Sequence, residues 1–225
     1  MPGTAGSKVR IVIADDHSIV REGLRRMLAG SQVEVVGEAG SGEEALRLVA
    51  EQRPDLVLLD IRMPGMDGFT ALREIKRTSP QIPVLMLTAY DDPSWLVQAV
   101  AYGAAGYLLK SLSREALVAS IRAVADGDSL IAPAHLRVVI QQLGHDTSDT
   151  AAGITGDLSK LTAREGEVLA LLAEGLTNQQ IAHVLGVAPS TIKPHVENVM
   201  LKLGASDRTQ AAVMAVKAGI TRPSA

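Results

Sequence analysis

The chain has 225 residues, 47% of them hydrophobic and only 2% aromatic, which suffices for one large or two ordinary domains with aliphatic cores. It contains no cysteine, which excludes a disulfide framework, a thiol nucleophile and a cysteine zinc site. The net charge is −3, and residues 157–225 carry 7 basic and 6 acidic side chains, so charge alone does not predict nucleic-acid binding.

The sequence also lacks the marks of a membrane or exported protein. No apolar run approaches the length of a membrane span. Residues 1–8 are small and polar and lack the apolar core of a signal peptide. We therefore expect a cytoplasmic protein that does not contact membranes.

Strand and helix patterns alternate through residues 8–126. Short apolar runs, each followed by a helical pattern, predict an α/β domain whose parallel sheet is covered by helices on both faces. The predicted strands are residues 9–14, 33–39, 55–59, 83–87 and 106–109. The predicted helices are residues 18–29, 43–52, 68–78, 93–102 and 113–126, with Ser18 as the N-cap of the first.

Polar side chains follow the predicted strands where each strand ends. The apolar run before Asp60 stops at that carboxylate and gives way to a Pro-Gly loop. The first strand ends at Asp15 and Asp16, the fourth at Thr88 and the fifth at Lys110. If the strands follow the flavodoxin-like order 2-1-3-4-5, all five side chains project into one crevice, where open α/β sheets bind ligands.

Such a cluster has a specific chemistry. Neighbouring carboxylates repel one another, and they relax by protonation or by binding a cation. With oxygen ligands and room for water, the natural cation is Mg²⁺. A carboxylate beside Mg²⁺ can attack a phosphoryl group and form an aspartyl phosphate, while an ammonium and a hydroxyl stabilise the phosphoryl oxygens.

Residues 8–126 resemble the receiver domain of bacterial two-component response regulators. The resemblance is carried by Asp15-Asp16, Leu58-Leu59-Asp60-Ile61-Arg62-Met63-Pro64-Gly65-Met66-Asp67-Gly68, Leu87-Thr88-Ala89 and Gly106-Tyr107-Leu108-Leu109-Lys110. It implies a flavodoxin-like (βα)5 fold with a five-stranded parallel sheet.

The same resemblance implies roles for individual residues. Asp60 would accept phosphate from a sensor histidine kinase, with Thr88 and Lys110 assisting at the catalytic site. Thr88 and Tyr107 would relay the phosphorylation state as a switch. The implied Mg²⁺ ligands are Asp15, Asp16, Asp60 and the backbone carbonyl of Arg62.

A linker and a second, helical domain are predicted after residue 126. Residues 127–156 are the predicted linker, and within them residues 133–143 have the spacing of an amphipathic helix. Residues 157–221 show only helical patterns, with capping-box sequences at Thr162 and Thr177. Two helices about a tight Gly-containing turn indicate a helix-turn-helix, although many small helical bundles share this pattern.

Residues 157–221 resemble the LuxR-type DNA-binding domain. The matching stretches are Leu161-Thr162-Ala163-Arg164-Glu165, Leu172-Ala173-Glu174-Gly175-Leu176-Thr177-Asn178-Gln179-Gln180-Ile181-Ala182, Ser190-Thr191-Ile192-Lys193-Pro194-His195-Val196 and Lys202-Leu203-Gly204-Ala205-Ser206-Asp207-Arg208-Thr209-Gln210-Ala211. The resemblance implies that the helix near Ser190 enters the major groove, that Lys193 contacts bases and phosphates and that Lys202 lies near the DNA backbone. The implied DNA-binding residues are Thr177, Asn178, Ser190, Thr191, Lys193, His195, Glu197 and Lys202.

Two residues depart from that family's pattern. Glu197 stands at a groove-facing position that is often basic or polar in the family. Pro194 stands early in the recognition helix. Its missing N–H has no energetic cost if Pro194 lies in the first turn, because the N–H groups there have no partner within the helix. We therefore expect this helix to begin at Thr191 or later.

The whole chain thus resembles a two-domain response regulator of the NarL/FixJ type, which is not an enzyme. The implied partners are a sensor histidine kinase, promoter DNA and a second copy of the chain when phosphorylated, with RNA polymerase as a further candidate. An aspartate-nucleophile phosphohydrolase would need an acid two residues after the nucleophile, where this chain has Arg62. A receiver adaptor whose C-terminal helices bind a protein stays open as a third interpretation.

Overall fold

The computed structural model describes residues 8–90, 92–128, 130, 158–205 and 208–220. The chain divides into two compact units, one of residues 1–91 and 107–125 and the other of residues 92–106 and 126–225. None of the helices in the described ranges combines the length and apolar character that a membrane crossing requires. The predicted helix over residues 133–143 lies outside the described residues.

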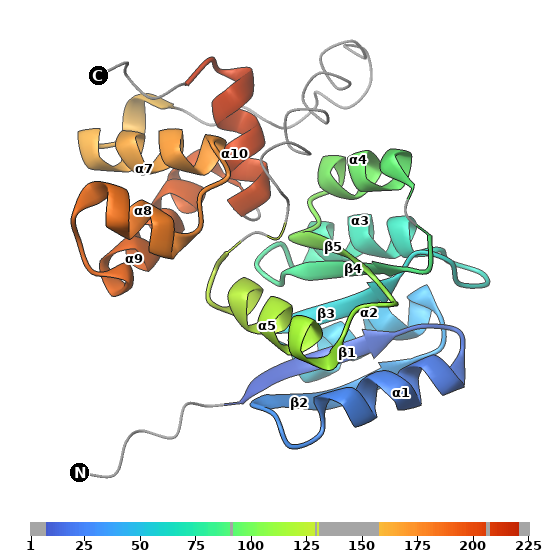
Figure 1. Ribbon diagram of the computed structural model, residues 1–225. Helices are drawn as coiled ribbons and strands as arrows, with labels where there is room; N and C mark the ends of the chain where they lie inside the picture. Colours follow the sequence, from blue (N-terminus) through green and yellow to red (C-terminus); the bar gives the residue numbers. More distant parts are fainter. Residues whose placement is uncertain (1–7, 91, 129, 131–157, 206–207, 221–225) are drawn as a thin grey trace. The chain divides into compact units, whose positions relative to one another are not determined.

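The first unit is built on a parallel sheet in the order β2-β1-β3-β4-β5 (Figure 1). This confirms the predicted α/β fold and strand order. The strands are β1 Val9–Ala14, β2 Val33–Ala39, β3 Leu56–Asp60, β4 Val84–Thr88 and β5 Gly106–Leu109. The helices that alternate with them are α1 Ser18–Leu28, α2 Gly42–Gln52, α3 Gly68–Thr78, α4 Pro93–Ala101 and α5 Arg114–Ala125.

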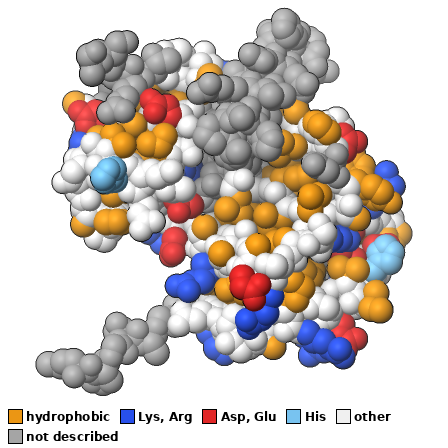
Figure 2. Space-filling view, in the orientation of Figure 1, with side chains coloured by type: hydrophobic (Ala, Val, Ile, Leu, Met, Phe, Trp, Pro, Cys, Tyr) orange, Lys and Arg blue, Asp and Glu red, His pale blue; other side chains and the backbone are white. Residues whose placement is uncertain are grey.

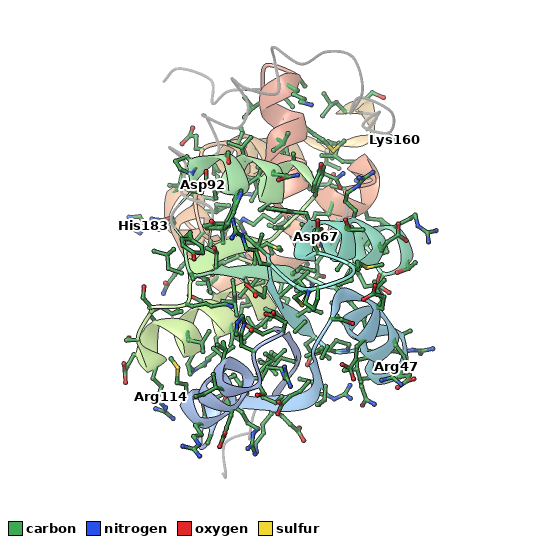
Figure 3. The ribbon with its side chains drawn as sticks, turned by 90° about the vertical axis from the view of Figure 1, so that its right-hand side faces the viewer. Arg47, Asp67, Asp92, Arg114, Lys160 and His183 are labelled. Carbon is green, nitrogen blue, oxygen red and sulfur yellow. The ribbon has the colours of Figure 1, made fainter. Side chains whose placement is uncertain are left out.

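The central strands β3 and β4 are apolar up to their last residue because both faces of the sheet are covered. Every residue of β3 and β4 is buried. Helices α1 and α5 pack against each other on one face, and α2 and α3 pack against each other on the opposite face (Figure 1). Arg114 at the start of α5 ties the first pair together, since its guanidinium donates to the carbonyls of Met27 and Ala29 at 2.7 and 2.9 Å (Figure 3).

Helix starts in this unit are set by short polar side chains, with one exception. Asp67 accepts a hydrogen bond from the Thr70 N–H at 2.7 Å and so caps α3 (Figure 3). The expected N-cap of α1 was wrong. Ser18 is the first residue inside that helix, and His17 precedes it as an N-cap whose side chain makes no capping bond. The backbone N–H of His17 instead donates to Asp15 Oδ1 at 2.9 Å.

Helix α4 follows β4 in the chain but is grouped with the second unit, whose other elements are helices joined by tight turns. Besides α4 its helices are the 3₁₀ turn Leu158–Lys160, α7 Ala163–Ala173, α8 Asn178–Leu185, α9 Pro189–Leu203 and α10 Arg208–Lys217. Thr162 and Thr177 form the predicted capping boxes with Glu165 and Gln180. Gly186 and Gly204 end α8 and α9 in the left-handed conformation, with φ of 64° and 66°.

Candidate functional site

The carboxyl ends of β1, β3 and β5 bring two acids and one ammonium together. Asp15 directly follows β1, and Asp60 is the last residue of the neighbouring β3. Lys110 follows β5, and its backbone N–H donates to the carbonyl of Thr88 at 2.7 Å. The Lys110 Nζ lies 2.6 Å from Asp15 Oδ2 and 3.0 Å from Asp60 Oδ2. These three predicted site residues therefore form one cluster.

Burial and charge shift the ionisation of this cluster. Burial raises the pKa of the Asp60 carboxyl, the hydrogen bond from Lys110 opposes that rise, and the charge of Asp15 adds to it. For Lys110 burial alone would lower the pKa, but hydrogen bonds to Asp15 and Asp60 outweigh it and raise the pKa above its ordinary value. Lys110 is therefore a fixed positive charge between two carboxylates at neutral pH.

Asp16 lies beside this cluster and is exposed to solvent. Its Oδ1 lies 2.7 Å from His17 Nδ1, and Asp15 Oδ1 lies 3.5 Å from the same nitrogen. One ligand atom each of Asp15, Asp16 and His17 lies within 4.8 Å of the others, a grouping that can hold a metal ion. Sequence reasoning did not single out His17, and its position directly after the two acids was the available signal.

Thr88 and Tyr107 are connected through the backbone of Tyr90. The buried Thr88 hydroxyl accepts from the Tyr90 N–H at 3.1 Å and donates to the Tyr90 carbonyl at 3.2 Å. The half-buried Tyr107 hydroxyl donates to the same carbonyl at 3.1 Å. The Arg62 guanidinium lies 5.4 Å from the centre of the exposed Tyr90 ring. The two predicted switch residues thus share one acceptor.

Glycine at position 68 lets α3 approach the end of β3. The Gly68 N–H donates to the Ile61 carbonyl at 2.9 Å and closes the loop after Asp60. A Cβ atom at Gly68 would lie 2.0 Å from the Asp60 carbonyl oxygen, closer than any non-bonded contact allows. The dipeptide Asp67-Gly68 therefore fixes the backbone that presents Asp60.

In the second unit, the predicted DNA contact Lys202 is held by an internal ion pair. Its Nζ lies 2.6 Å from Oε2 of Glu165, whose side chain is 5% exposed. The same carboxylate accepts from the N–H and the hydroxyl of Thr162 at 2.7 and 2.9 Å. The bond from Lys202 and then those from Thr162 lower the pKa of Glu165 to about 2. Lys202 thus joins α9 to the start of α7.

The residues at the start of α8 are mostly committed to internal contacts. Thr177 is half-buried, and its N–H donates to Gln180 Oε1 at 2.8 Å. Asn178 is buried and accepts a hydrogen bond from the Arg208 guanidinium at 2.6 Å.

The expected start of α9 was wrong. The helix begins at Pro189, where a proline is favourable because the first residue needs no N–H partner. Pro194 therefore lies inside the helix and removes the hydrogen bond that this position would donate to the Ser190 carbonyl.

The two faces of α9 differ in character. Ile192, Val196, Val199 and Leu203 point into the core. The exposed residues of the helix are Pro189, Ser190, Thr191, Lys193, Pro194, Glu197, Asn198 and Leu201, whereas His195 is half-buried. Four of the predicted DNA-binding residues thus lie on one accessible surface.

Comparison with known proteins matches two segments of the chain to known families. Residues 11–122 match the response regulator receiver domain family, and residues 159–215 match the bacterial regulatory proteins of the luxR family. The transcriptional regulatory protein DegU of Brevibacillus brevis is 36% identical over 95% of both chains. The probable transcriptional regulatory protein NarL of Mycobacterium tuberculosis (strain H37Rv) is 41% identical over 93% of this chain and 94% of its own.

Solved structures agree with this assignment. The response regulator ChrA of a heme-sensing two-component system is 33% identical, with a TM-score of 0.50 over 95% of this chain and 99% of its own. The RcsB response regulator of Salmonella typhimurium is 26% identical, with a TM-score of 0.54 over 94% and 100%. The chain belongs to the two-component response regulators that join a receiver domain to a LuxR-type DNA-binding domain, and it is a transcriptional regulator of that kind.

Proposed function

We propose that Asp60 accepts a phosphoryl group from a phosphohistidine of a sensor histidine kinase and that this phosphorylation controls DNA binding. The observation that carries the proposal is the Lys110 ammonium, which lies 2.6 Å from Asp15 and 3.0 Å from Asp60. A fixed ammonium beside a carboxylate at the end of a buried strand is suited to pair with an incoming phosphoryl group.

In the proposed transfer the nucleophile is the Asp60 carboxylate. An Asp60 Oδ atom forms the new bond to phosphorus, while the bond between phosphorus and the kinase imidazole breaks and leaves its electron pair on that nitrogen. Asp60 Oδ1 accepts the Ile61 N–H at 2.9 Å, which orients the carboxylate. Lys110 pairs with one phosphoryl oxygen, and the Thr88 hydroxyl leaves Tyr90 to donate to another.

The charges of the site fit a divalent cation. Asp15, Asp16 and Asp60 supply three carboxylates, and Lys110 places one full positive charge against Asp15 and Asp60. These carboxylates and the backbone carbonyl of Arg62 would hold Mg²⁺, since hard oxygen donors are its preferred ligands. When bound, Mg²⁺ would neutralise charge on the phosphoryl oxygens.

We further propose that the second unit reads promoter DNA through α9. The exposed hydroxyls of Ser190 and Thr191 and the exposed ammonium of Lys193 lie at the start of this helix and suit contacts in a major groove. The proposed domains are residues 8–126, 127–156 and 157–221. Phosphorylation would favour a homodimer that binds DNA in the cytoplasm and engages RNA polymerase, without catalytic turnover of a substrate.

The phosphorylation site is tested directly by mass spectrometry. Full-length protein incubated with Mg²⁺ and a small phosphodonor should carry phosphate on Asp60 alone. Asp60→Asn should abolish the modification. The control Asp67→Asn should keep it, because asparagine also caps a helix well. Unchanged phosphorylation of Asp60→Asn would refute the assignment.

A further inference from the structure

The exposed face of α9 has an unusual composition for a surface that meets DNA. At 100° per residue, Ser190, Pro194, Glu197 and Leu201 follow one another along the middle of this face. The middle line therefore carries a hydroxyl, an imino acid, a carboxylate and a leucine that is 81% exposed. Lys193 lies to one side of the line. Lys and Arg side chains cover only a small part of the visible face of the second unit (Figure 2).

The carboxylate of Glu197 is available to contact another molecule. Its side chain is exposed on the outer face of α9, opposite the buried Val196 and Val199. Among the residues that the structure describes, none forms a hydrogen bond or ion pair with the side chain of Glu197 or of Lys193. The i, i+4 spacing of these two side chains places them about 6 Å apart along the helix axis.

A carboxylate on a surface that meets DNA is unfavourable unless a donor of the DNA forms a hydrogen bond with it. DNA phosphates repel the carboxylate, and in a groove without a hydrogen-bond donor it would lose its hydrogen bonds to water without replacement. In the major groove the base amino groups are the donors, and a glutamate characteristically accepts from cytosine N4. A lysine characteristically donates to O6 and N7 of guanine.

We propose that Glu197 is a specificity-determining residue that selects a cytosine one or two base-pair steps from a guanine contacted by Lys193. The two side chains are about 6 Å apart along the helix axis, and a base-pair step rises by about 3.4 Å, so a helix inclined in the major groove brings them to bases no more than about two steps apart. This inference rests on the proposed reading of DNA by α9 and names the bases that it reads. Glu197 thereby rejects thymine and guanine at its position, because both present acceptors to its carboxylate in the major groove.

The test uses the full-length protein with Mg²⁺ and beryllofluoride as the phosphoryl mimic. Sequences bound from a random duplex pool define the preferred site, and each base pair of that site is then replaced in turn. Binding is measured for the wild type, Glu197→Gln and Glu197→Ala. Glu167→Gln serves as control, because it removes an exposed negative charge from α7 of the same unit without touching α9.

The expected result is a change at one base position. Glu197→Gln should switch its preference from cytosine to adenine, because glutamine pairs with adenine N6 and N7. Glu197→Ala should reduce the preference for cytosine by roughly 5-fold to 50-fold, and Glu167→Gln should leave it unchanged.

Two results would overturn the inference, and they differ in cause. If both Glu197 variants keep the wild-type preference at every position, Glu197 is not a base reader although the protein binds DNA. If the wild type prefers no sequence at all, the proposed reading of DNA by α9 fails first, and the inference fails with it.

Discussion

Replacement of Gly68 by alanine tests how closely the backbone around Asp60 is packed. The new Cβ would lie 2.0 Å from the Asp60 carbonyl oxygen and 2.8 Å from Ile61 Cα. These are backbone atoms of β3 and the residue after it, so no side-chain rotation relieves the contact. An ordinary carbon–oxygen contact is about 3.3 Å, so the start of α3 must retreat by roughly 1 Å.

The cost of that retreat has two parts. Overpacking against rigid atoms costs about 1–3 kcal/mol. The 2.9 Å hydrogen bond from Gly68 to the Ile61 carbonyl is stretched beyond its useful range, which costs about 1 kcal/mol more. We therefore expect Gly68→Ala to lower the free energy of unfolding by about 2–4 kcal/mol, and the melting temperature by roughly 10 °C.

Calorimetry of the full-length protein measures this effect, and Gly23→Ala is the matched control. Gly23 lies inside α1, and a Cβ there would meet nothing within 4 Å. Alanine at that position should raise the free energy of unfolding by about 0.5–1 kcal/mol through helix propensity. If Gly68→Ala melts at or above the wild-type temperature while Gly23→Ala behaves as expected, the described packing at Asp60 is wrong.

Three further predictions concern the switch, the second unit and the DNA contacts. Thr88→Ala should accept phosphate but lose most of the phosphorylation-dependent rise in dimerisation, because Tyr107 and the phosphoryl group are no longer linked through Tyr90. Analytical ultracentrifugation measures the dimerisation, and an undiminished rise in Thr88→Ala would contradict this role. Because the folded pKa of Glu165 is about 2, below its ordinary value, its stabilisation is complete above pH 4.5 and is lost as the pH falls toward 2. Acid titrations of unfolding should therefore show a flatter pH dependence in Glu165→Gln than in the wild type, and parallel curves would refute the pair. Lys193→Ala should weaken binding to the preferred site by about 1–3 kcal/mol and relax the sequence preference of the protein. Lys202→Ala should weaken binding to all duplexes alike, lower the salt slope by roughly one unit and also destabilise the fold, because Glu165 loses its cation. Binding titrations at several salt concentrations separate the two effects, and an unchanged sequence preference in Lys193→Ala would exclude Lys193 as a base reader.

The receiver fold and its charged cluster could be predicted because their signals are local. Apolar runs that end in polar residues mark parallel strands, and the ends of such strands meet at one edge of the sheet. Asp15, Asp60 and Lys110 therefore came together as expected. The capping boxes at Thr162 and Thr177 were also readable, since each depends on residues three positions apart.

The start of α9 could not be predicted from the cost of Pro194 alone. That cost argued for a helix beginning at Thr191 or later, but Pro189 at the first position favours the earlier start. Burial of four apolar residues of the helix in the core offsets the free energy of the lost hydrogen bond. Tertiary packing thus outweighed a local penalty.

The pairing of Lys202 with Glu165 lay beyond sequence reasoning for a different reason. The two residues are separated by 37 positions, and neither has a local pattern that indicates its partner. Lys202 was predicted to contact DNA phosphates because its position matches one near the DNA backbone in the LuxR-type family. The ion pair with Glu165 adds a structural role that is visible only in the fold. Likewise, the shared carbonyl of Tyr90 between Thr88 and Tyr107 depends on how β4 and β5 lie side by side.

The central claim is that phosphorylation of Asp60 controls DNA binding, and one measurement tests it most directly. The affinity of the full-length protein for its selected duplex is measured with Mg²⁺, with and without beryllofluoride, for the wild type and for Asp60→Asn. We predict that beryllofluoride changes the wild-type affinity by about 5-fold to 150-fold, the usual range of coupling between two sites, and leaves the affinity of Asp60→Asn unchanged. An equal response of both proteins, or no response of the wild type, would contradict the claim.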